Sequence, residues 1–143
     1  MALPDPVPGL VIRYSYLWGR EAREGREEGG KDRPCAIVVA AGRAEDGRTR
    51  VMVAPITHAP PRVVGEAVEV PLQVGRALGL DDARSWIVTA EVNLFTWPGP
   101  DVRPARGRDF AFGRLPNRLL GQVRRGVLER VRLGVGIVER DEV

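Results

Sequence analysis

The sequence predicts a mainly β, α+β domain: about five or six short strands forming a small, closed or half-closed barrel or curled sheet, then one helix. Short apolar runs, several with a period of two, are separated by turns rich in Gly and Pro. From Pro116 the apolar residues instead recur at steps of three and four, which is typical of one helix face. The 143 residues fit a single domain spanning 1–143.

The first strand is predicted in "LVIRYSYLW" (residues 10–18), where large apolar residues alternate with a period of two. The segment that follows, residues 19–32, is rich in glycine and densely charged with both signs. We expect it to be a long, flexible surface loop that joins two strands. Loops of this length within compact domains are often functional or disordered.

The next two strands form a predicted antiparallel hairpin. "PCAIVVAA" (residues 34–41) is apolar at successive positions, which indicates a central strand buried on both faces. "GRAEDGRTR" (residues 42–50) supplies a turn, and "VMVAPI" (residues 51–56) supplies the second strand.

Shorter elements follow the hairpin. "AVEVP" (residues 67–71) predicts a short edge strand, and "LQVGRALGLDD" (residues 72–82) allows one or two helical turns that stop at Gly79. "SWIVTAEVNLF" (residues 85–95) and "RDFAFGRL" (residues 108–115) predict the last two strands.

A helix is predicted from Pro116 to Val131, because one apolar stripe runs along it. The stripe consists of Leu115, Leu119, Leu120, Val123, Val127, Leu128 and Val131. Gly121 and Gly126 each disfavour a helix by about 1 kcal/mol relative to alanine, so packing against the sheet must hold it. Residues 132–143 are expected to form a tail.

Composition limits the function classes. The net charge is +3, and Lys31 is the only lysine among 22 basic residues. This arginine bias has two open explanations, a GC-rich genome and phosphate recognition, since a guanidinium binds phosphate oxygens bidentately.

Cys35 is the only cysteine, which excludes an internal disulfide and is typical of a core residue in a reducing cytoplasm. No apolar run is long enough to span a membrane, and residues 1–10 lack the features of a signal peptide.

The residue inventory also limits the chemistry. One cysteine and one histidine cannot form a zinc site of the usual composition, and no phosphate-binding glycine loop or nucleophile elbow is present. Metal-free acid–base chemistry remains, with Arg33, Thr57 and His58 as candidates. Thr57 and His58 lie where the strand in "VMVAPITHAPPRV" must end before two prolines. The alternative is a turn in which both side chains only bind local backbone groups.

Several motifs in order resemble the MazF/PemK family of toxin ribonucleases. These motifs are "PGLVIRYSYLW", "KDRPCAIVVA" after a polar loop, "VMVAPITH", "VTAEVNLFTW" and the final helix. The resemblance covers residues 8–131. It implies an SH3-like barrel of the MazF, PemK and CcdB type with a C-terminal helix, a cytoplasmic homodimer, and neutralisation by a small acidic antitoxin. It also implies cleavage of single-stranded RNA without metal or cofactor, through attack of the 2′-hydroxyl that leaves a 2′,3′-cyclic phosphate.

The family's catalytic arginine and threonine carry over to Arg33 and Thr57. Negative charge builds on the phosphate oxygens during attack, and a fixed guanidinium stabilises that transition state more than the ground state. The Thr57 hydroxyl can donate a further hydrogen bond. His58 could transfer a proton, but neighbours in an extended segment point to opposite faces, so a direct role and a structural role both stay open. For Arg33 the alternative is a salt bridge to Asp32 or to a loop glutamate.

Five residues are expected to contact RNA: Arg13, Trp18, Lys31, Asn93 and Trp97. Trp18 and Trp97 could stack on bases or pack in the core, and Asn93 could contact a base edge or cap a turn. Two other functions remain open, namely a poison that acts by binding a protein, like the gyrase inhibitors of the same barrel type, and a nucleic-acid-binding family member without activity.

Overall fold

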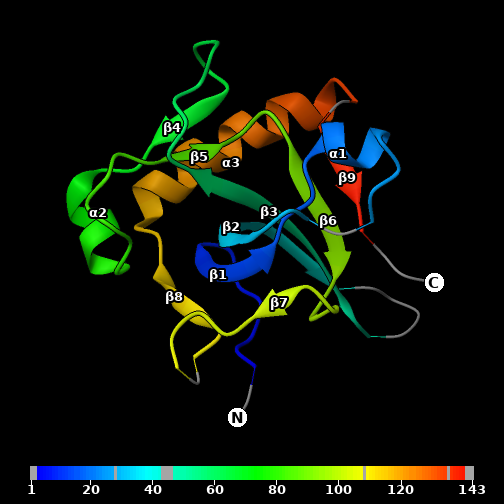
Figure 1. Ribbon diagram of the computed structural model, residues 1–143, viewed down its shortest axis with the longest axis horizontal. Helices are drawn as coiled ribbons and strands as arrows, with labels where there is room; N and C mark the ends of the chain where they lie inside the picture. The colour runs from blue at the N-terminus through cyan, green and yellow to red at the C-terminus, as the bar shows by residue number, and fades with distance from the viewer. Residues whose placement is uncertain (1–2, 28, 43–46, 108, 135, 141–143) are drawn as a thin grey trace.

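The computed structural model describes residues 3–27, 29–42, 47–107, 109–134 and 136–140, and it shows a mainly antiparallel sheet with a long helix across one face (Figure 1). The predicted α+β, mainly β class is confirmed. The elements in order are β1 (Leu10–Ser15), α1 (Gly19–Arg23), β2 (Asp32–Gly42), β3 (Thr49–Thr57), β4 (Ala67–Glu69), α2 (Leu72–Ala77), β5 (Trp86–Val88), β6 (Val92–Thr96), β7 (Val102–Arg103), β8 (Ala111–Arg114), α3 (Asn117–Arg132) and β9 (Ile137–Glu139).

The sheet has the strand order β4-β5-β3-β2-β1-β7, and three further strands pair with members of this series. β6 pairs with β3, β8 pairs with β1, and β9 lies parallel to β6. Within the described residues β4 and β7, at the two ends of the order, do not pair with each other, so the sheet is not closed.

The central hairpin forms as predicted, and β2 and β3 are buried on both faces. Ala36 and Val38 of β2 pack with Ala54 of β3 in a cluster that α3 covers. Cys35 and Ile37 pack on the opposite face in a second cluster with the tyrosines of β1. Alternation along the strands therefore divides the apolar residues between two clusters, and a strand in this position must be apolar at successive residues.

A register shift in this hairpin decides which side chains meet at its open end. The β2–β3 register changes by one residue between Ile37 and Val39, which marks a β-bulge. Beyond the bulge Cys35 pairs with Pro55, and continuing this register by two residues places Arg33 opposite Thr57. Opposite residues of antiparallel strands share a face, so the bulge brings these two side chains to the same side of the sheet.

One predicted strand is divided in the structure. The single strand predicted for residues 85–95 is two strands, β5 and β6, which pair with different parts of β3. The break lies beside Ala54 and Pro55 of β3, where proline has no N–H to donate to a neighbouring strand. There the N–H groups of Thr89 and Ala90 both donate to the Glu66 carbonyl, at 2.8 and 3.2 Å.

The remaining elements refine the predictions. The segment 19–32 contains α1, and β1 ends before it, at Ser15. The predicted helix forms as α3, and Leu119, Val123 and Val127 are buried beneath it. Within the expected tail, β9 pairs with β6, while residues 135 and 141–143 lie outside the described residues. No described helix is both long enough and apolar enough to cross a membrane.

Candidate functional site

A cleft of about 520 Å³ opens at the end of the sheet where β3 stops. One wall comes from Trp18, Arg20 and Lys31 of the segment that connects β1 to β2, residues 16–27 and 29–31, here called the cleft loop. The other wall comes from the segment between β3 and β4, and from the strand β5 with the residues after it. The start of β2 and the end of β3 contribute Arg33 and Thr57 to the lining. The two residues predicted to act together therefore face one cleft.

Arg33 is half-buried in this cleft, and its guanidinium lies over an aromatic ring. The guanidinium carbon is 5.1 Å from the centroid of the Trp18 ring. The Nε atom of Arg33 is buried and has no hydrogen-bond partner among the described residues. An unpaired buried donor costs about 1–3 kcal/mol. No salt bridge from Arg33 to Asp32 is formed in the described chain.

Thr57 presents a hydroxyl whose orientation is restricted. Its Oγ1 atom accepts a hydrogen bond from the Ala59 N–H at 3.2 Å. Among the described residues the hydroxyl proton has no acceptor, so it is available to a ligand. Because threonine is β-branched, its χ1 is restricted as well. The site thus offers a fixed cation and a fixed neutral donor on the same face of the hairpin.

His58 does not line the cleft, although it follows Thr57 directly. Its Nδ1 atom is 2.9 Å from the carbonyl oxygen of Arg84, and its Nε2 atom is 3.0 Å from a carboxylate oxygen of Asp81. Both ring nitrogens are therefore engaged with the segment before β5. This arrangement favours the structural alternative for His58 and gives no support to a direct part in the chemistry.

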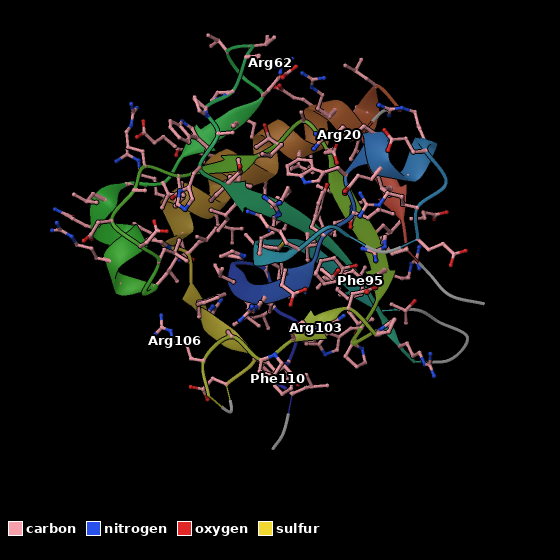
Figure 2. The ribbon with its side chains drawn as sticks, viewed as in Figure 1. Arg20, Arg62, Phe95, Arg103, Arg106 and Phe110 are labelled. Carbon is pink, nitrogen blue, oxygen red and sulfur yellow. The ribbon has the colours of Figure 1, made fainter. Side chains whose placement is uncertain are left out.

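Among the charged side chains of the described cleft lining, cations outnumber carboxylates. Arg20 and Lys31 of the cleft loop, and Arg62 between β3 and β4, join Arg33 there. Figure 2 shows Arg20 and Arg62 at the same end of the molecule. Arginine matches phosphate geometry bidentately, and an anionic chain is the ligand class that this lining favours.

Two carboxylates also line the cleft, and both already bind protein groups. Glu66 forms an ion pair with Arg130 of α3, with 3.2 Å between the nitrogen and the oxygen. Glu91 accepts hydrogen bonds from the Tyr16 hydroxyl at 2.9 Å and from the Gly19 N–H at 3.0 Å. Among the described residues Arg130 offsets the charge of Glu66, whereas Glu91 has only neutral donors and keeps its charge. The four cations of the described lining therefore outnumber the remaining carboxylate.

The other predicted RNA contacts divide between the cleft and the rest of the molecule. Trp18 and Lys31 line the cleft. Arg13 is exposed on β1, with its Nε 3.8 Å from a carboxylate oxygen of Asp32. Trp97 is half-buried and packs against the second apolar cluster. The structure therefore brings Arg33, Thr57, Trp18 and Lys31 together and leaves Arg13 and Trp97 outside.

Asn93 is fully buried, and its amide is occupied by backbone groups. Its Oδ1 accepts from the Leu17 N–H at 2.9 Å, and its Nδ2 donates to the Leu17 carbonyl at 2.8 Å. The side chain thus pairs with Leu17 as a neighbouring strand would. No part of it is exposed to contact a base, so its role in this structure is to hold the cleft loop.

Sequence reasoning did not select Arg20, Arg62, Glu66 or Glu91. The arginine-rich composition of segment 19–32 signals Arg20, but no pattern in the sequence shows that residues 62, 66 and 91 meet it. Cys35 is fully buried and burial raises the pKa of its thiol, so it is not an available nucleophile. Within the described ranges no three His, Cys, Asp or Glu side chains gather to hold a metal ion. Neither a model of a protein family nor a curated protein matches the chain.

Proposed function

We propose that this chain is a metal-independent endoribonuclease that cleaves single-stranded RNA, with the SH3-like barrel of the MazF/PemK type. The observation that carries the proposal is that Arg33 and Thr57 line one cationic cleft from opposite positions of the hairpin. An RNA phosphate bound there would receive hydrogen bonds from the guanidinium and from the free hydroxyl proton of Thr57.

The proposed reaction is attack of the RNA 2′-hydroxyl on the adjacent phosphorus. The bond from phosphorus to the 5′-oxygen breaks, and a 2′,3′-cyclic phosphate and a 5′-hydroxyl form. The non-bridging oxygens gain negative charge during attack, and Arg33 and Thr57 stabilise it. A preorganised donor of this kind contributes about 3–4 kcal/mol. Arg33 already lies against Trp18, so little reorganisation is needed when the charge develops.

The biological part of the proposal is that the enzyme is the cytoplasmic toxin of a toxin–antitoxin pair and acts as a homodimer. The excess of cations in the cleft fits a small acidic antitoxin, since a segment rich in Asp and Glu would compete with RNA for the same arginines. Growth arrest on expression, relieved by Arg33→Ala and by Thr57→Ala, is the expected behaviour. Arrest that persists with both substitutions would indicate a poison that acts by binding a protein.

Cleavage of RNA in the presence of a chelator tests the chemistry. Wild-type protein should yield fragments with 2′,3′-cyclic phosphate ends, and an RNA with a 2′-deoxy sugar at the cleaved position should stay intact. Arg33→Gln should lower the rate by about 10²–10³-fold, and Thr57→Val by about 10–100-fold. Arg76→Gln, on the exposed surface of α2, is the matched control. Intact RNA with the wild-type protein, or equal rates with Arg33→Gln, would refute the mechanism.

One observation favours a second function, an RNA-binding protein without activity. The only histidine of the chain lies outside the cleft, so no imidazole is placed to transfer the proton of the 2′-hydroxyl. Tight, salt-dependent binding of RNA with no cleavage would support this function, because release of counterions makes phosphate binding fall steeply with salt.

A further inference from the structure

Arg140, directly after β9, carries a buried charge that the proposed chemistry does not use. Its side chain is 2% exposed. One terminal nitrogen donates to the Ser15 carbonyl at 2.8 Å and to Asn93 Oδ1 at 3.0 Å. The other donates to the Glu27 carbonyl at 3.3 Å and lies 3.0 Å from a carboxylate oxygen of Asp101. A buried guanidinium is tolerated only when paired and hydrogen-bonded in this way.

The two backbone acceptors of Arg140 lie just before the cleft loop and within it. Ser15 is the last residue of β1, immediately before the cleft loop, and Glu27 lies within that loop. Asn93, which also binds Arg140, holds the Leu17 backbone between them. β9 lies beside α1 next to β6 (Figure 1). The guanidinium thus binds the cleft loop directly at Glu27, and it binds Asn93, which holds the loop at Leu17.

The cleft loop supplies one wall of the cleft through Trp18, Arg20 and Lys31. Arg33 and Thr57, in contrast, lie on the central hairpin, which two apolar clusters hold in place. Loss of the Arg140 contacts would free the backbone at Glu27 and remove one of the hydrogen bonds that orient Asn93 against Leu17. The wall that carries Trp18, Arg20 and Lys31 would therefore loosen, although Glu91 still binds the Gly19 N–H, while the hairpin keeps its register.

We propose that Arg140 is a positioning residue that latches the cleft loop in the conformation that forms the wall of the cleft. The role requires arginine, because its planar group reaches backbone carbonyls, an amide oxygen and a carboxylate from fixed nitrogens. A lysine ammonium has three donors at one point and cannot span these acceptors. The latch joins segments that are far apart in sequence, so the cleft is complete only when β9 is docked.

Limited trypsin digestion of the folded Arg140→Lys protein tests the latch. The cleft loop offers cut sites after Arg20, Arg23 and Arg26, and the outer face of α3 offers cut sites after Arg118 and Arg124 as an internal reference. Local opening should accelerate cutting in the cleft loop by about tenfold or more and leave the α3 sites unchanged. The surface variant Arg76→Lys, which keeps its tryptic site, should digest like the wild type.

Two digestion results would overturn the proposal. The first is a cleft-loop rate within about twofold of wild type, which means that Arg140 does not restrain the loop. The second is equal acceleration at the cleft loop and at α3, which means that Arg140 only stabilises the whole chain. Should Arg140→Lys fail to fold, Asp101→Asn removes one charged acceptor while keeping its shape. It should accelerate cleft-loop cutting several-fold, and the same two results count against the latch.

A binding measurement gives a result that a purely structural role of Arg140 would not change. This second experiment rests on the proposed function. An oligonucleotide with 2′-deoxy sugars throughout serves as a single-stranded probe that cannot be cleaved. Arg140→Lys should weaken binding of this probe about fivefold. It should also reduce the slope of log K against log salt by the amount that about one to two phosphate contacts contribute, because Arg20 and Lys31 move away. Weaker binding with an unchanged slope would count against the latch. If wild-type protein neither binds the probe nor cleaves RNA, the proposed function fails, and the digestion still decides the latch.

Discussion

In the proposed ribonuclease, replacing Trp18 by leucine should slow RNA cleavage mainly through Arg33, not through lost stacking on a base. The Arg33 guanidinium lies 5.1 Å from the centre of the Trp18 ring and is half-buried. A cation–π contact contributes about 0.5–1 kcal/mol when exposed and about 2 kcal/mol when desolvated. A value of about 1–2 kcal/mol for this half-buried pair corresponds to a fall in kcat of about 5–30-fold.

Single-turnover cleavage at saturating RNA measures this effect. Trp18→Phe keeps an aromatic face and should restore most of the rate. In the Arg33→Ala background, Trp18→Leu should change kcat by less than about twofold, since the guanidinium that it positions is gone. Arg20→Gln is the matched control, because it removes the other cation near this ring, at 5.7 Å, and leaves Arg33 in place.

Two results would refute this reasoning about Trp18. One is an equal loss from Trp18→Leu with and without Arg33, which would mean that the two residues act independently. The other is a rise in KM at unchanged kcat, which would indicate that Trp18 binds RNA equally in the ground and transition states. Either result would return Trp18 to the base-stacking role.

Three further outcomes are expected. Asn93→Ala, measured by urea denaturation, should destabilise the fold by about 2–4 kcal/mol because buried backbone groups lose their partner; a change below about 0.5 kcal/mol would contradict the structural role. His58→Gln should keep kcat within about threefold of wild type, whereas a loss of 10²-fold or more would make His58 a general acid or base. Burial raises the pKa values of Tyr14, Tyr16 and Cys35. Their folded forms hold protons that the unfolded chain releases, so stability is retained below the unfolded pKa values, about 8.5 for the thiol and about 10 for the phenols. The free energy of unfolding should fall as pH rises above these unfolded pKa values, by about 1.4 kcal/mol per pH unit for each group. Phenolate absorbance that rises before unfolding would contradict this.

The hairpin and the helix were predictable because their signals are local. Successive apolar residues in 34–41 and 51–56 require two strands with both faces covered, and the structure provides the two clusters that cover them. The period of three and four after Pro116 requires one covered helix face, which α3 presents to the sheet. The break between β5 and β6 and the pairing of β9 depend on distant segments, so periodicity within the chain does not indicate them.

The candidate site also has a part that the sequence determines and a part that only the tertiary structure decides. The sequence by itself determined that an arginine would open one buried strand and that threonine and histidine would end its partner. Only the tertiary structure decided which of those two faces Arg33. The bulge between Ile37 and Val39 shifts the register by one residue, so Arg33 lies opposite Thr57; the register before the bulge would have placed it opposite His58. A shift of one residue turns every side chain to the other face of a strand, and it depends on how the whole sheet packs rather than on the residues at the site.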